Sequence, residues 1–96
     1  MSFVEDFSII KQLDPKAVIQ QGKDGEWNLK AKIKVKADGK KIVPHKTNAP
    51  TAEDCARCMM LELTGRYSRN VLGVINCYNQ EVFWDSEREC FVPWWE

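Results

Sequence analysis

The chain has 96 residues, a length that forms one domain and can bury a core without disulfide or metal staples. Its hydrophobic content of 44% is that of a globular protein, and no apolar run approaches the ~20 residues of a membrane span. Residues 1–6 lack the basic and apolar regions of a signal peptide. We therefore expect a cytoplasmic protein with no membrane partner, whose four cysteines are reduced thiols.

The net charge is zero, but the charges are segregated along the chain. Residues 1–48 carry all ten lysines against six acidic residues, whereas residues 49–96 carry four arginines against eight acidic residues. This segregation predicts an oriented surface potential and favours no particular fold.

The first 25 residues predict short elements. Residues 3–13 contain an apolar stretch that fits either a strand or one helical turn, and Asp14-Pro15 punctuates it. Residues 17–21 fit a short strand, and Gly22-Lys23-Asp24-Gly25 predicts a turn.

The clearest pattern is the strict alternation of residues 27–37, which indicates a half-buried β-strand. One face carries Trp27, Leu29, Ala31, Ile33, Val35 and Ala37, and the other carries Asn28, Lys30, Lys32, Lys34 and Lys36. Asp38-Gly39 predicts a tight hairpin turn. The returning strand is expected over residues 40–43, with Pro44 ending its ladder.

A helix is predicted over about residues 52–64. Thr51 is the expected N-cap, with Asp54 as a variant of the capping box and Gly65 as the stop. The buried stripe of this helix is expected to comprise Ala52, Cys55, Ala56, Met59, Met60 and Leu63.

Three further strands are expected over residues 71–78, 81–84 and 89–95, with Pro93 placing the last one at a sheet edge. The chain therefore predicts a single α+β domain, residues 1–96. Its antiparallel β-sheet comprises two β-meanders of about five to six strands and packs against one central helix.

The C-terminal strands are apolar on both faces. Neighbouring residues in a strand point to opposite faces, so neither Phe83-Trp84 nor Trp94-Trp95 can enter one core together. The second face requires cover from residues 1–20, from another copy of the chain or from a partner protein. The residues expected to bind a partner are Trp84, Phe91, Trp94 and Trp95.

The lysine row is the second candidate surface. It comprises Lys30, Lys32, Lys34 and Lys36 together with Lys40 and Lys41 from the next strand. Such a row can bind an acidic protein, follow a phosphate backbone, or simply be a solvated sheet face. The zero net charge, and the absence of arginine and aromatic residues from the row, weigh against nucleic acid.

Cysteine chemistry is the weakest candidate. Cys55 and Cys58 form a CxxC, and Cys77 and Cys90 complete a set of four thiols, which allows zinc or redox activity. The CxxC lies within the predicted helix, and Cys55 falls on its apolar stripe, so buried thiols are favoured. His45 is expected to be an exposed residue at a strand end. No catalytic set, cofactor motif, metal site or small-molecule site is recognised.

Residues 25–66 resemble the arm-type DNA-binding module of phage-type tyrosine recombinases. The matching segments are Gly25-Glu26-Trp27, Asp38-Gly39-Lys40-Lys41 and Thr51-Ala52-Glu53. The resemblance covers less than half of the chain. It implies a three-stranded sheet packed on one helix, and it adds support to the nucleic-acid alternative.

These features together predict a non-enzymatic protein-binding module that binds a partner protein or a second copy of itself. A nucleic-acid-binding module is the alternative, and a zinc- or thiol-dependent protein is the third hypothesis. Small proteins without an enzyme motif are common among phage and mobile-element genes. A modulator or inhibitor of a host protein complex is therefore also expected, by association alone.

Overall fold

The computed structural model describes residues 3–37, 39–68 and 71–93. In chain order, its elements are α1 (Phe3–Leu13), β1 (Val18–Gln21), β2 (Trp27–Ala37), β3 (Gly39–Ala49), α2 (Ala52–Arg66), β4 (Val74–Ile75), β5 (Glu81–Asp85) and β6 (Cys90–Pro93). The predicted α+β class is confirmed, with two helices in place of one. Neither described helix is long and apolar enough to cross a membrane.

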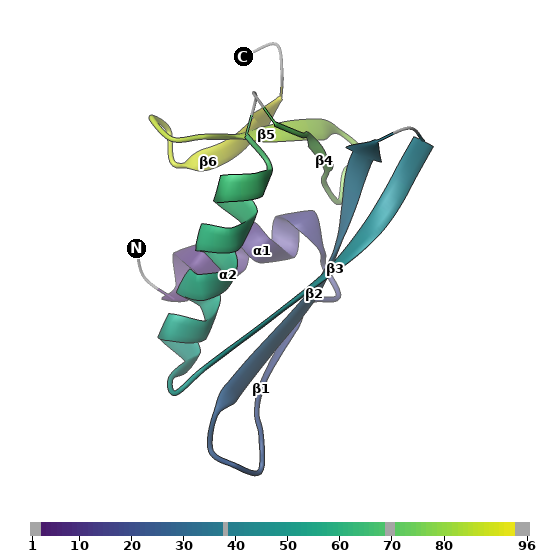
Figure 1. The fold of residues 1–96 in the computed structure, drawn as a ribbon. Coiled ribbons are helices and arrows are strands. Elements are labelled where there is room, and N and C mark those ends of the chain that lie inside the picture. The colour runs from purple at the N-terminus through teal and green to yellow at the C-terminus, as the bar shows by residue number, and fades with distance from the viewer. Residues whose placement is uncertain (1–2, 38, 69–70, 94–96) are drawn as a thin grey trace.

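The six strands form one antiparallel sheet built around β2. Its order is β1-β2-β4-β5-β6, and β3 pairs with β2 as well. Along one edge, β2 pairs with β3 over its whole length, from Trp27 opposite Ala49 to Ala37 opposite Gly39. Along the other edge, β2 pairs first with β1 and then with β4. The long β2–β3 ribbon is therefore the frame that holds the rest of the sheet (Figure 1).

The N-terminal segment is an α-helix, so the expectation of a strand or a single turn there is wrong. Ile10 and Leu13 are buried one turn apart, in the same core cluster as Leu29 and Met59. Helix α1 packs against α2 and β2, and both helices lie on the same side of the β2–β3 ribbon (Figure 1). The helices therefore form one layer and leave the opposite face of the ribbon uncovered.

The alternation of β2 buries one face of the strand and exposes the other, as predicted. Leu29, Ile33 and Val35 are buried, whereas the intervening lysines are exposed. The helix facing them buries Cys55, Ala56, Met59, Met60 and Leu63. Ala52, the remaining residue of the predicted stripe, is half-buried.

Strand β3 continues through Pro44, so the expectation that this proline ends the strand's ladder is wrong. Opposite Pro44, the N–H of Lys32 points to the other edge of β2 and donates to Asp14. Lys32 and Pro44 are therefore a non-hydrogen-bonded pair, and the proline nitrogen faces away from the ladder. Since β3 is an edge strand, the missing N–H removes no ladder bond.

Helix α2 begins as predicted and ends later. The Thr51 hydroxyl accepts a hydrogen bond from the Asp54 N–H at 3.1 Å. The helix passes through Gly65 to Arg66, because Tyr67 caps it by donating its N–H to the Leu63 carbonyl. Tyr67 is itself buried, so core packing carries the helix past the glycine.

The C-terminal meander is shorter than predicted at its start. Only Val74 and Ile75 of the expected strand 71–78 pair with a neighbour. The Asn76 carboxamide oxygen instead accepts hydrogen bonds from the Tyr78 and Gln80 N–H groups, which forms a turn. Strands β5 and β6 lie where expected, and Pro93 is on the edge strand β6. The rest of the strand predicted over 89–95 lies outside the described residues.

Candidate functional site: the lysine face

The register of β2 and β3 gathers lysines from both strands onto one face. Residues directly opposite each other share a face, so Lys46 joins Lys30 and Lys40 joins Lys36. We call this surface the lysine face; it carries Lys30, Lys32, Lys34, Lys36, Lys40 and Lys46. All six side chains are exposed. The predicted Lys41 lies opposite Val35 and belongs to the other face.

The lysine face also exposes apolar side chains, which the sequence analysis did not anticipate. Ile42 lies opposite Lys34, Pro44 opposite Lys32, and Val18 of β1 opposite Lys30. Ile42 is 58% exposed and Val18 is 53% exposed. The lysine row of β2 is therefore flanked by apolar side chains from β1 and β3.

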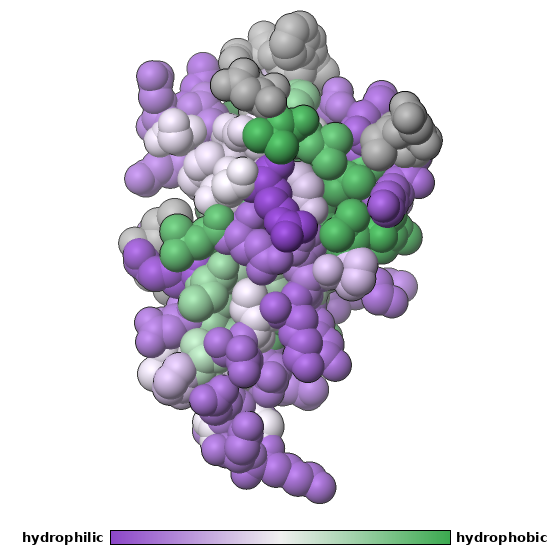
Figure 2. Space-filling view, viewed as in Figure 1, coloured by the Kyte–Doolittle hydropathy of each residue, from purple (hydrophilic) through white to green (hydrophobic). Residues whose placement is uncertain are grey.

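The large exposed hydrophobic residues are distributed over several elements. In the part of the chain that the structure describes, the large exposed ones are Val4, Val18, Ile42, Leu61, Val71 and Tyr78. Figure 2 shows a largely hydrophilic end around the β1–β2 turn and hydrophobic residues gathered nearer the other end. Two of the six lie on the lysine face.

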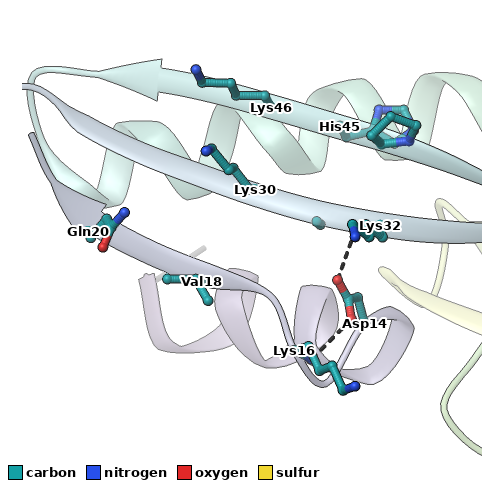
Figure 3. A pocket seen from close by; sticks show the side chains of 10 residues that line it. Asp14, Lys16, Val18, Gln20, Lys30, Lys32, His45 and Lys46 are labelled. Atoms are coloured by element: carbon teal, nitrogen blue, oxygen red, sulfur yellow. Dashed lines mark hydrogen bonds between the residues drawn. The ribbon is translucent and has the colours of Figure 1, made fainter.

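Two open grooves lie along the lysine face. The first has a volume of about 700 Å³, and its charged lining is Asp14, Lys16, Lys30, Lys32 and Lys46 (Figure 3). The second has a volume of about 540 Å³ and lies beside Lys34, Ile42 and Ile75. Asp14, Lys16 and Lys32 line both grooves, so the two are neighbours.

Asp14 fixes the floor between the grooves. Its carboxylate accepts the Lys32 N–H at 2.8 Å and the Lys16 N–H at 3.0 Å. The first of these bonds falls in the gap along β2 between β1 and β4, where no strand is present to accept it. The side chain thus joins the end of α1 to the central strand and positions Lys16 beside the lysine face.

The aromatic set is placed differently from the lysines. Trp84 and Phe91 lie opposite each other on β5 and β6, with ring centroids 5.3 Å apart in an edge-to-face arrangement. Both are half-buried and pack against the core. Phe83 lies opposite Val92 on the other face of the meander. Trp94 and Trp95 lie outside the described residues, so the aromatic partner surface stays a prediction.

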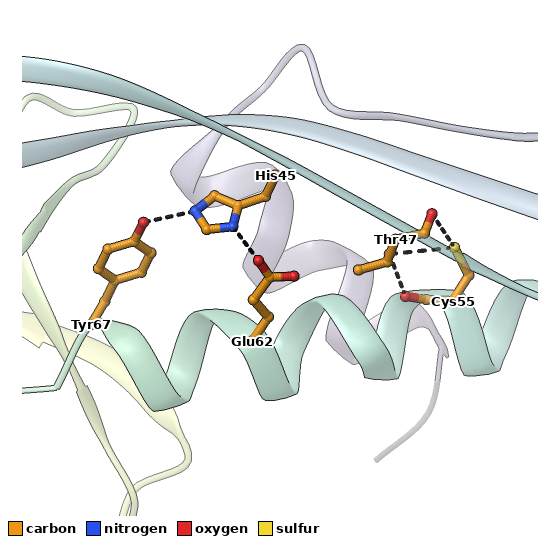
Figure 4. Close-up of polar contacts among 5 residues, drawn as sticks. All are labelled: His45, Thr47, Cys55, Glu62 and Tyr67. Atoms are coloured by element: carbon orange, nitrogen blue, oxygen red, sulfur yellow. Dashed lines mark hydrogen bonds and ion pairs between the residues drawn. The ribbon is translucent and has the colours of Figure 1, made fainter.

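His45 is buried, contrary to the expectation of an exposed strand-end residue. It lies opposite Ala31, on the face covered by the helices, and is 4% exposed. Its Nδ1 lies 2.8 Å from a Glu62 carboxylate oxygen, and its Nε2 lies 2.7 Å from the Tyr67 hydroxyl (Figure 4). Extending the predicted hairpin register past Pro44 would have revealed this burial.

The Glu62–His45–Tyr67 network has the order of an orienting acid, a base and a hydroxyl nucleophile. In the tautomer that carries its hydrogen on Nδ1, His45 donates to the Glu62 carboxylate and its Nε2 accepts from the Tyr67 hydroxyl. Burial raises the pKa of Tyr67, against the lowering effect of Arg66, so the hydroxyl keeps its proton. Tyr67 is only 3% exposed, so its hydroxyl is covered in this structure.

The cysteines are distributed over several environments. The buried Cys55 thiol donates to the Thr47 carbonyl at 3.4 Å, while the Thr47 hydroxyl donates to the Cys55 carbonyl at 3.1 Å (Figure 4). Cys58 and Cys77 are exposed and Cys90 is intermediate, so the expectation of buried thiols holds for Cys55 alone. Within residues 3–37, 39–68 and 71–93, no group of three or more histidine, cysteine or acidic residues could hold a metal ion.

Comparison of this chain with protein-family models, with curated proteins and with solved structures found no match.

Proposed function

We propose that this protein is a non-enzymatic binding module that binds an acidic region of a partner protein on its lysine face. One observation carries the proposal: six exposed lysines lie on a single open sheet face and keep their charge unneutralised. None of the six forms an ion pair with a carboxylate of the described residues. Asp14, the acidic residue among them, directs its oxygens to backbone N–H groups.

The apolar side chains of the lysine face favour a protein over a polyphosphate. Specific protein interfaces combine apolar and polar contacts, and Ile42, Pro44 and Val18 supply exposed apolar groups beside the β2 lysines. Charge at an interface accelerates association with an oppositely charged partner and selects against others. The zero net charge of the whole chain keeps attraction to arbitrary polyanions weak.

Nucleic acid is the second candidate, supported by the arrangement of β1, β2 and β3. These strands form a three-stranded antiparallel sheet with α2 packed behind β2 and β3, as the resemblance to arm-type modules implies. The lysines lie on the face away from that helix, where a duplex would bind. This candidate lacks an arginine, phenylalanine, tyrosine or tryptophan among the groove-lining residues.

The test compares Lys32→Glu/Lys34→Glu with Lys23→Glu/Lys41→Glu, which has the same net charge but changes residues outside the lysine face. Each tagged protein is incubated with cell lysate, with and without nuclease, and the bound material is identified. We expect the wild type and the control to retain a defined acidic protein after nuclease, and the lysine-face variant to lose it.

Recovery of nucleic acid, with every bound protein lost after nuclease, would replace the proposal with the second candidate. Equal retention by the two double variants would show that the lysine face is not the binding surface.

A further inference from the structure

We infer that the lysine face binds an extended acidic segment whose apolar side chains alternate with carboxylates, and that this segment lies along both grooves. The inference rests on the proposed function and specifies the chemistry of the partner. The observations behind it are the continuity of the grooves, the apolar side chains that flank their lysines, the spacing of those lysines, and the position of Asp14.

The two grooves form one trough along β2. They meet at Asp14, Lys16 and Lys32, which line both. The first groove extends towards β1, where Gln20 lines it, and the second extends past β4 to the turn at Asn79. The trough therefore crosses the gap between β1 and β4 and offers an elongated site.

Apolar side chains lie on both sides of the β2 lysines in the trough. Val18 and Pro44 line the first groove, and Ile42 and Ile75 line the second. Val18 and Ile75 belong to β1 and β4 at one edge of β2, whereas Pro44 and Ile42 belong to β3 at the other edge. A bound segment therefore meets ammonium groups along β2 and hydrocarbon from the strands beside it.

The spacing matches a peptide in the extended conformation. Lys30, Lys32 and Lys34 lie at every second residue of β2 and span ~13 Å at ~3.3 Å per residue. Side chains of an extended peptide alternate between two sides with the same period. The apolar side chains on one side of the peptide can therefore contact the apolar residues beside β2, while the carboxylates on its other side reach the β2 lysines as charge-assisted partners.

The position of Asp14 disfavours binding of a uniform polyanion in the trough. Its carboxylate lies where the two grooves join, so a phosphate backbone or a run of glutamates places negative charge beside it in every register. An alternating segment can place an apolar side chain there instead. Base stacking is also unsupported, because no phenylalanine, tyrosine or tryptophan lines either groove.

The experiment uses three probes and isotope-labelled full-length protein, with binding followed by NMR titration. The probes are a ten-residue peptide alternating glutamate with valine or leucine, the same peptide with serine in place of each apolar residue, and a ten-nucleotide oligothymidine. We expect the alternating peptide to bind about tenfold more tightly than the serine peptide, and to shift amides of β2 and β3 along the trough.

Matched surface variants locate the apolar contribution. Ile42→Ser should remove most of the difference between the two peptides, because Ile42 is an exposed apolar residue that lines the trough beside Lys34. Leu61→Ser should leave that difference unchanged, because Leu61 is similarly exposed but lies on α2. Both residues are more than half exposed, so neither substitution opens the core.

The outcomes separate the inference from the proposed function. Equal affinity for the two peptides would overturn the inference and leave an electrostatic acidic-partner site. Tighter, salt-sensitive binding of oligothymidine would overturn both in favour of nucleic acid. If no probe shifts lysine-face amides, the proposed function fails with the inference.

Discussion

Tyr67 completes a buried hydrogen-bond network, and its hydroxyl can be removed without changing the shape of the ring. In Tyr67→Phe, the Nε2 of His45 stays in the core without the donor that lies 2.7 Å away. An unsatisfied buried acceptor costs about 1–3 kcal/mol, so we expect the free energy of unfolding to fall by that amount. Urea denaturation measures it.

Tyr78→Phe is the matched control, because Tyr78 is 76% exposed and should tolerate the same change. If both variants unfold at the same urea concentration, the network adds nothing to stability.

The burial of the Asp6 carboxyl group predicts that the stability of the protein depends on pH. The side chain is 2% exposed, and its Oδ1 has no hydrogen-bond partner among the described residues. Burial raises the pKa of Asp6 above its ordinary value of 3.8, while Arg57 acts in the opposite direction. Between the two pKa values the folded state binds more protons than the unfolded chain, so stability falls as pH rises through this window.

The measurement is the unfolding free energy of Asp6→Asn and of the wild type between pH 3 and pH 7. The wild type should lose stability relative to the variant as pH rises above the ordinary pKa. Asp24→Asn, at an exposed turn, is the control. A wild type and Asp6→Asn that respond identically to pH would refute the raised pKa.

At the scale of elements, the central strand depends on a side chain where the sheet has a gap. Strand β2 passes from β1 to β4 with Asp14 accepting the Lys32 N–H between them. We expect Asp14→Ala to lower the unfolding free energy by about 1–3 kcal/mol and to accelerate hydrogen exchange at the Lys32 amide. In Asp14→Asn the carboxamide oxygen can still accept, so that amide should stay largely protected.

Continued protection of the Lys32 amide in Asp14→Ala would show that another group accepts this N–H.

At the scale of the whole molecule, one core joins the elements. Buried residues of α1, β2, α2, β4 and β5 belong to a single cluster, which includes Ile10, Leu29, Met59, Val74 and Val82. We therefore expect one cooperative unfolding transition, with far-UV circular dichroism and tryptophan fluorescence changing at the same denaturant concentration. Separate midpoints would mean that the C-terminal meander unfolds independently of the β2–β3 ribbon.

Much of this fold could be predicted because its strongest patterns are local. The alternation over 27–37 located β2 and its buried face, and the Thr51 cap located the start of α2. Helix α1 could not be recognised in the same way, because an isolated 11-residue helix is marginal and is stabilised by packing. The continuation of β3 through Pro44 depends on its being an edge strand, which is a property of the whole sheet.

The candidate site, like the fold, could be predicted from the sequence only in part. The sequence by itself placed lysines on one face of β2 and apolar residues on the other, because side chains alternate along any strand. Only the tertiary structure decided that this face stays open, that Lys41 leaves it, and that Asp14 and Val18 complete a trough beside it. It also buried His45 beneath the helices. Alternation follows from the local backbone, whereas burial depends on which distant segments pack together.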